Sequence, residues 1–213
     1  MKTTRGRNPS ASSRDAGLSL VEVLVAVLVV VTVALGGAGL SINGIQTATA
    51  QQRQQVAVTI ANGAMETVSG WSVANLVTGR YYLLVTGAFS NYAAQPGVNM
   101  TYPMWDAAAP VGGNGSIPIT VAPPIPSATE NGTEYTTATL IGTCYEPVTG
   151  GTCALLPGYP STPPAVTPAG YVSLIRIIIL VSWTAGAKCT ASTCYYETTT
   201  LADPHSDLAW VTS

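Results

Sequence analysis

Glu22 is the only charged residue in an apolar run from Leu18 to Leu40, LSLVEVLVAVLVVVTVALGGAGL. An ionised side chain at the centre of a membrane helix costs about 2.5–3.5 kcal/mol, and less near the helix end. A cation on a neighbouring helix would offset this cost and would fix the axial register, because other registers leave the carboxylate unpaired. The sequence therefore predicts a pairing role for Glu22. The alternative is a carboxylate that reaches the water at the membrane surface.

Four cysteines supply the second set of reactive side chains: Cys144, Cys153, Cys189 and Cys194. An even number of cysteines in an exported domain indicates disulfides, and three pairings are possible. We favour the two local pairs, Cys144–Cys153 and Cys189–Cys194, because each flanks a turn-like sequence (EPVTGGT and TAST). The alternative is a tetrahedral zinc site, but the wide spacings fit poorly with the usual Cys-x2-Cys knuckle.

Catalytic residue sets are missing from the sequence. The only histidine, His205, lies in Asp203-Pro204-His205-Ser206-Asp207, which is typical of a polar turn. No Ser/His/Asp set, phosphate-binding loop or pair of carboxylates stands out, so we expect no enzyme and no cofactor. A loose aromatic group either packs in the core or forms an adhesive surface. Its members are Trp71, Tyr81, Tyr82, Tyr92, Tyr102 and Trp105.

The charges are few and unevenly placed. Only 8% of the 213 residues are charged, against about 25% in ordinary globular proteins. Residues 1–17 carry four cations and one acid, whereas residues 18–213 carry four cations and nine acids. The basic leader predicts a cytoplasmic N-terminus, with residues 18–40 spanning the membrane and the rest outside. Because the outer part is net acidic, we expect no nucleic-acid partner.

The apolar run continues without proline into an amphipathic stretch that ends near Gly70. Its stripe of Val56, Ala57, Ile60, Ala61, Ala64, Met65 and Val68 has helical spacing. Beyond it, residues 171–183 give the clearest strand signal and residues 194–201 a second one, joined as a hairpin, while residues 134–145 give a weaker signal. We predict an α+β fold in which residues 1–17 are a leader, 18–69 a long helix, and 70–213 a β-rich domain packed on that helix.

The stretch Gly17-Leu18-Ser19-Leu20-Val21-Glu22, after a basic leader, resembles the processing site of type IV pilins and pseudopilins. The following Val23-Leu24-Val25-Ala26 strengthens the match, and LVEVLVA is similar to PilV-like minor pilins. The resemblance implies a pilin-like fold and cleavage between Gly17 and Leu18 by a membrane prepilin peptidase, followed by methylation of the Leu18 amine. Glu22 of one subunit would then pair with the Leu18 amine of its neighbour. Phe often stands in the family where this chain has Leu18.

The implied partners are the prepilin peptidase, other pilin subunits, an inner-membrane assembly platform and, before assembly, membrane lipid. The implied location is the cytoplasmic membrane, crossed once, and then an extracellular pilus. A pseudopilin of a type II secretion or competence system is the nearest alternative. Two alternatives belong to another class: a secreted binding domain cleaved near Gly39 after the small residues Gly36-Gly37-Ala38, and a permanently anchored surface protein.

Overall fold

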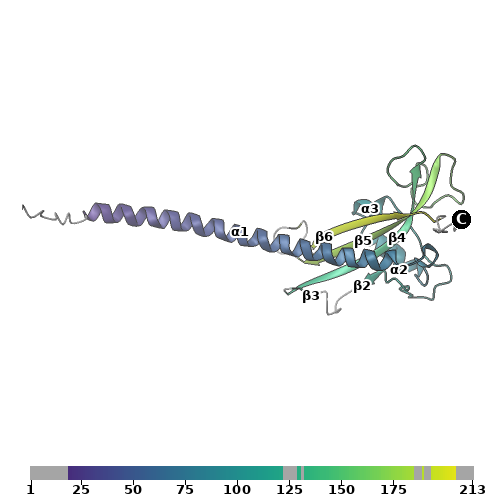
Figure 1. Ribbon diagram of the computed structural model, residues 1–213, viewed down its shortest axis with the longest axis horizontal. Coiled ribbons are helices and arrows are strands. Elements are labelled where there is room, and N and C mark those ends of the chain that lie inside the picture. The colour runs from purple at the N-terminus through teal and green to yellow at the C-terminus, as the bar shows by residue number, and fades with distance from the viewer. Residues whose placement is uncertain (1–18, 122–128, 131, 185–188, 190–192, 205–213) are drawn as a thin grey trace, which may run out of the picture. The chain divides into compact units, whose positions relative to one another are not determined.

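The computed structural model describes residues 19–121, 129–130, 132–184, 189 and 193–204. Its internal contacts divide the chain into two units, Met1–Ala48 and Thr49–Ser213. The long helix α1, Leu20–Ser69, contributes residues to both units (Figure 1). The other elements belong to the second unit: η1 (Val73–Asn75), α2 (Tyr82–Asn91), α3 (Pro96–Asn99), β1 (Tyr102–Pro103), β2 (Thr120–Val121), β3 (Thr129–Glu130), β4 (Thr133–Pro147), β5 (Tyr171–Thr184) and β6 (Thr193–Ala202).

Helix α1 forms where the apolar run and the amphipathic stretch predicted a helix. It stays helical through Gly36 and Gly37 and ends at Ser69, directly before Gly70. Its first part is long and apolar enough to cross a membrane. The Gly17–Leu18 bond, predicted to be the processing site, lies outside the described residues.

The second unit is built on an antiparallel sheet with the strand order β1-β4-β5-β6. The long strands β4 and β5 pair from Tyr135 opposite Trp183 to Pro147 opposite Tyr171. Strand β6 then pairs with β5 from Thr193 opposite Thr184 to Ala202 opposite Ile175. The structure thus confirms the predicted α+β class, the three predicted strands and the hairpin between the last two.

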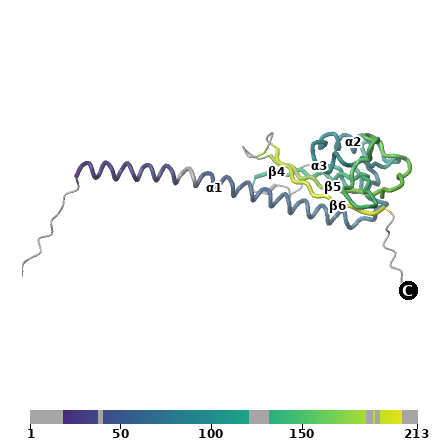
Figure 2. Tube along the Cα trace, turned by 90° about the horizontal axis from the view of Figure 1, so that it is seen from above, coloured from purple at the N-terminus to yellow at the C-terminus, as the bar shows by residue number. Residues whose placement is uncertain are grey.

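The sheet of the second unit is covered on both faces, as Figure 2 shows. The part of α1 that belongs to the second unit packs on one face, where Ala57 and Ala61 are fully buried in a cluster with Ile177 and Ile179 of β5. Helix α2 and the turn α3 cover the opposite face, where Val85 and Val98 are buried with Leu180. Alternate residues of β5 therefore serve two cores, which explains why the central stretch Ile177–Val181 is entirely apolar.

Candidate assembly site on the N-terminal helix

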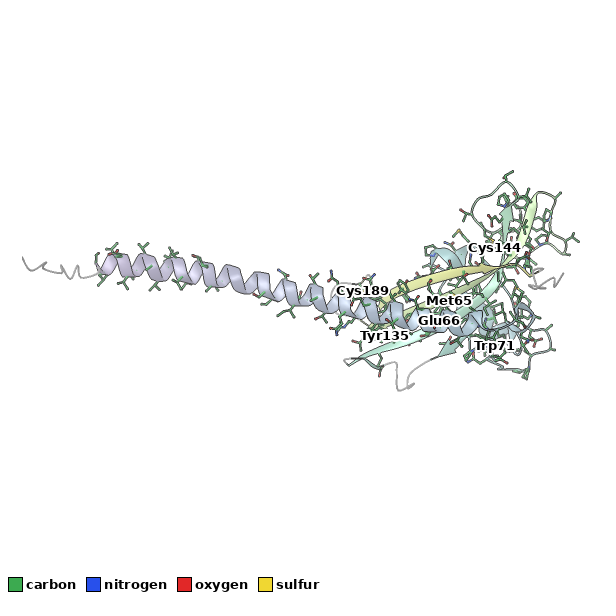
Figure 3. All side chains as sticks on the ribbon, viewed as in Figure 1. Met65, Glu66, Trp71, Tyr135, Cys144 and Cys189 are labelled. Atoms are coloured by element: carbon green, nitrogen blue, oxygen red, sulfur yellow. A yellow bond between two sulfur atoms is a disulfide. The ribbon has the colours of Figure 1, made fainter. Side chains whose placement is uncertain are left out.

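The described part of the first unit is an isolated apolar helix. Between Leu20 and Ala48, every described side chain is exposed, and Leu20 retains 77% of its accessible surface. The large apolar side chains of this part stand out around the helix in Figure 3. They are Leu20, Val21, Val23, Leu24, Val25, Val27, Leu28, Val29, Val30, Val31, Val33, Leu35, Ile42 and Ile45. Such a continuous apolar surface is unfavourable in water and needs lipid or protein to cover it.

Ser19 shapes the start of this helix. Its Oγ accepts a hydrogen bond from the backbone N–H of Val21 at 3.2 Å. Its carbonyl accepts the N–H of Glu22 at 2.9 Å and the N–H of Val23 at 3.2 Å. These bonds satisfy backbone donors that would otherwise lack partners at a helix N-terminus.

Glu22 occupies the first turn of α1 and is exposed. A negative side chain there interacts favourably with the helix dipole, and the Ser19-x-x-Glu22 spacing is that of a capping box. None of the described side chains donates a hydrogen bond to the Glu22 carboxylate. The helix start therefore tolerates a carboxylate and leaves its oxygens available to a donor. This local contribution was not predicted, although the Ser-x-x-Glu pattern is typical of a capping box.

The part of α1 in the second unit presents a second surface, which the sheet covers. Ala57, Ala61 and Val68 retain at most 2% exposure, and Val56, Ile60, Ala64 and Met65 pack around them. The hydroxyl of Tyr135 on β4 also donates to the carbonyl of Arg53 at 3.2 Å. The predicted apolar stripe is thus confirmed as the face of α1 that packs on the sheet within the second unit.

The four cysteines form the two local disulfides that the spacing favoured, Cys144–Cys153 and Cys189–Cys194. The first is buried, with a Cα–Cα distance of 5.4 Å. Its loop is also closed by paired backbone hydrogen bonds between Tyr145 and Ala154, at 2.9 and 3.0 Å. The second joins Cys189 to the start of β6. Because all four sulfurs are bonded in pairs, none remains as a thiolate for zinc.

Arg80 is buried in the second unit, with 1% exposure. Its Nε donates to the carbonyl of Ile117 at 3.1 Å, and its Nη2 donates to the carbonyl of Thr139. Burial lowers the pKa of Arg80 to about 10. The guanidinium is therefore charged at neutral pH, and backbone carbonyls rather than water solvate it.

The neighbouring loop fixes the backbone of this arginine. The carboxylate of Asp106 accepts the N–H of Gly79 at 2.8 Å, and the Asp106 N–H donates to the Arg80 carbonyl at 3.0 Å. Backbone donors, first Gly79 and then Ala108, lower the pKa of Asp106. The acid thus acts as a structural cap for this loop.

Arg176 on β5 is the second buried cation, with 5% exposure. Its Nη1 donates to the Gly97 carbonyl at 3.2 Å and to Thr101 Oγ1 at 3.1 Å, and its Nη2 donates to the Cys153 carbonyl. Burial lowers the pKa of Arg176, while Glu197 opposes that shift. Since Arg80 and Arg176 are both internal, neither belongs to a surface that could bind phosphate. No local sequence pattern indicates either role.

The predicted aromatic group divides between the core and the surface. Tyr102 is buried and contacts Tyr145 edge to face, with 5.9 Å between ring centroids. Tyr82 and Trp105 also meet edge to face, at 4.8 Å, but they remain 45% and 41% exposed. The group is therefore not one adhesive surface. The polar turn that contains His205 lies largely outside the described residues.

Comparison of the chain with models of protein families, with curated proteins and with solved structures found no match in any of the three.

Proposed function

We propose that this chain is a type IV pilus subunit, specifically a PilV-like minor pilin. The observation that carries the proposal is the exposed apolar first part of α1 with Glu22 in its first turn. The apolar surface of this part of α1 must be buried along its length. Membrane lipid can bury it, and so can a bundle of similar helices. A protein that moves from bilayer to filament needs a helix that is stable in both environments.

The proposed sequence of events begins in the cytoplasmic membrane. The basic leader keeps the N-terminus inside while α1 crosses the bilayer once, and the second unit folds outside. A prepilin peptidase then cuts between Gly17 and Leu18 and methylates the Leu18 amine. The inner-membrane assembly platform next moves the processed subunit from lipid into the filament.

Glu22 supplies the specificity of assembly in this proposal. Cleavage creates a cationic amine four residues before it, about 6 Å along a helix axis. In the low dielectric of a helix bundle, the Glu22 carboxylate of one subunit pairs with the Leu18 amine of its neighbour. A shifted register leaves both charges unpaired, which disfavours it. The free carboxylate oxygens at the start of α1 are compatible with this role.

The second unit supplies the outer surface of the proposed subunit. The stripe of α1 binds the sheet through a closely packed alanine face, so the unit stays attached as the helix enters a filament. Two disulfides suit the oxidising conditions outside the cytoplasm. No step in this account needs a cofactor or catalytic residue of the chain.

Substitution of Glu22 by Gln tests the proposal, because it keeps the shape of the side chain and removes its charge. We expect normal membrane insertion and a reduced amount of the variant in sheared filaments. Glu66→Gln is the matched control, since Glu66 is an exposed acid farther along the same helix (Figure 3). Normal incorporation of the Glu22 variant would refute the pairing role, whereas equal loss of both variants would show a nonspecific effect.

A further inference from the structure

Glu197 and Arg176 hold the backbone of one residue, Gly97 of α3, from two neighbouring strands. Glu197 Oε1 on β6 accepts the Gly97 N–H at 2.9 Å, and Arg176 Nη1 on β5 donates to the Gly97 carbonyl at 3.2 Å. The Thr101 hydroxyl donates to the same carbonyl at 2.7 Å. A Cβ atom on Gly97 would overlap Glu197 Oε1, so a larger residue here would displace the carboxylate from its present position.

The second carboxylate oxygen of Glu197 has an unfavourable environment. Oε2 is buried and has no hydrogen-bond partner among the described residues. A charged oxygen without a donor is costly to remove from water, and protonation of the carboxyl removes most of that cost. The geometry therefore places an ionisable group where its neutral form fits better than its charged form.

Among the residues that the structure describes, few other charged or titratable groups lie on this face of the sheet. Arg176 from β5 favours the ionised carboxylate, and the α3 residues Pro96–Asn99 carry no ionisable side chain. Tyr195 lies on the same face of β6, and its ring contacts Tyr92 at the end of α2, with 6.2 Å between centroids. Burial raises the pKa of Tyr92, so its hydroxyl stays neutral in the acid range.

We infer that Glu197 makes the attachment of α3 to the sheet depend on pH, with the attachment tighter when the carboxyl is protonated. Burial raises the pKa of Glu197, and the Gly97 N–H and Arg176 oppose this shift only in part. A raised folded-state pKa in an acid gives stability that is present at low pH and is lost as pH rises through that pKa.

Opening of α3 has a defined structural consequence. Val98 of α3 is 4% exposed and packs in the cluster that includes Leu180 of β5. Its release from the sheet exposes part of that cluster. The pH-dependent contact of Glu197 thus determines whether α3 shields the face of the sheet opposite α1. This inference does not depend on the proposed pilin function.

Hydrogen exchange at the Gly97 amide tests this inference in the full chain in detergent micelles. The readout is the protection factor, the intrinsic exchange rate divided by the observed rate, at about pH 5 and about pH 8. We expect protection to fall towards pH 8, by up to about tenfold for each unit by which folding raises the pKa of Glu197. In Glu197→Gln the amide oxygen still accepts the Gly97 N–H, so protection is retained and does not change with pH.

Glu146→Gln is the matched control, since Glu146 is a partly exposed acid on β4. We expect the Gly97 amide of this variant to show the same pH dependence of protection as the wild type. A pH-independent wild type, or an undiminished dependence in Glu197→Gln, overturns the inference. If Glu197→Gln does not fold, carbon NMR titration of the wild-type Glu197 carboxyl decides. A midpoint above the ordinary value of about 4.3 supports the inference, and a midpoint at or below it contradicts it.

Discussion

Arg80, which lies before α2, donates a hydrogen bond from Nη2 to the backbone carbonyl of Thr139 in the middle of β4. The two residues are 59 positions apart in sequence, and both are buried. The same guanidinium binds the carbonyl of Ile117 at 3.1 Å. One cation thus connects three segments, including the long strand β4 and the loop that precedes β2.

Replacement of Arg80 by Met should destabilise the second unit by about 2–6 kcal/mol. The variant keeps an apolar side chain of similar length but leaves two buried carbonyls without donors, at about 1–3 kcal/mol each. Urea unfolding in detergent micelles, followed by tryptophan fluorescence, measures the change. Arg53→Met at a half-exposed position of α1 should cost less than about 0.5 kcal/mol. Equal effects of the two substitutions would contradict the role given to Arg80.

Two glycine substitutions should change stability in opposite directions. A Cβ on Gly142 would overlap the backbone carbonyl oxygen of Tyr102 in the paired strand β1, whereas a Cβ on Gly87 meets nothing within 4 Å. Gly142→Ala should therefore destabilise the unit by about 2–3 kcal/mol. Gly87→Ala, at an exposed position inside α2, should stabilise it by up to about 1 kcal/mol. The same unfolding measurement decides, and a tolerated Gly142→Ala would show that β1 does not lie where described.

Tryptic digestion without reduction should distinguish the disulfide pairings. Cleavage after Arg80, Arg176 and Lys188 places Cys144 and Cys153 in one peptide, and Cys189 and Cys194 in another. The pairs in the structure leave these peptides separate, each two mass units lighter than its reduced form. Either crossed pairing joins the peptides, and that product would contradict the structure.

Loss of the buried disulfide should also be measurable. Alanine at both Cys144 and Cys153 should cost about 2–3 kcal/mol of unfolding free energy, because the bond restricts a short loop in the unfolded chain. An unchanged urea midpoint would show that the loop is held by the Tyr145–Ala154 backbone pair alone.

Periodic sequence made the helix and the long strands predictable. Ala57 and Ala61 recur at a helical spacing, and the run from Tyr171 to Trp183 is rich in β-branched residues, so each pattern has one consistent interpretation. Both local disulfides could also be predicted, because the two cysteines of each pair are close in sequence. The pilin-type processing of Gly17 and the pairing of Glu22 stay predictions.

Helix α2 was missed because its signal is short and mixed. Val85, Ala88 and Phe89 are its buried residues and do have helical spacing. However, Thr86 and Gly87 are poor helix formers, and the prolines that follow indicated loops and strands. Packing on the sheet stabilises this helix, because its buried face contacts Leu140 and Leu180.

The internal arginines could not be predicted from any local pattern. Nothing near Arg176 in sequence supplies its acceptors, since Gly97, Thr101 and Cys153 come from other parts of the chain. Likewise, the need for glycine at position 142 arises only when β1 pairs with β4. Such contacts join residues that are distant in sequence, so they can be identified only from the folded structure.

The most direct test of the central claim is the N-terminus of the protein purified from the membrane and filament fractions of its native host. Intact mass and N-terminal peptide analysis should find a chain that lacks residues 1–17 and begins with N-methylated Leu18. A chain that retains the basic leader, or one that begins near Gly39 and so lacks Glu22, would contradict the proposed processing and assembly.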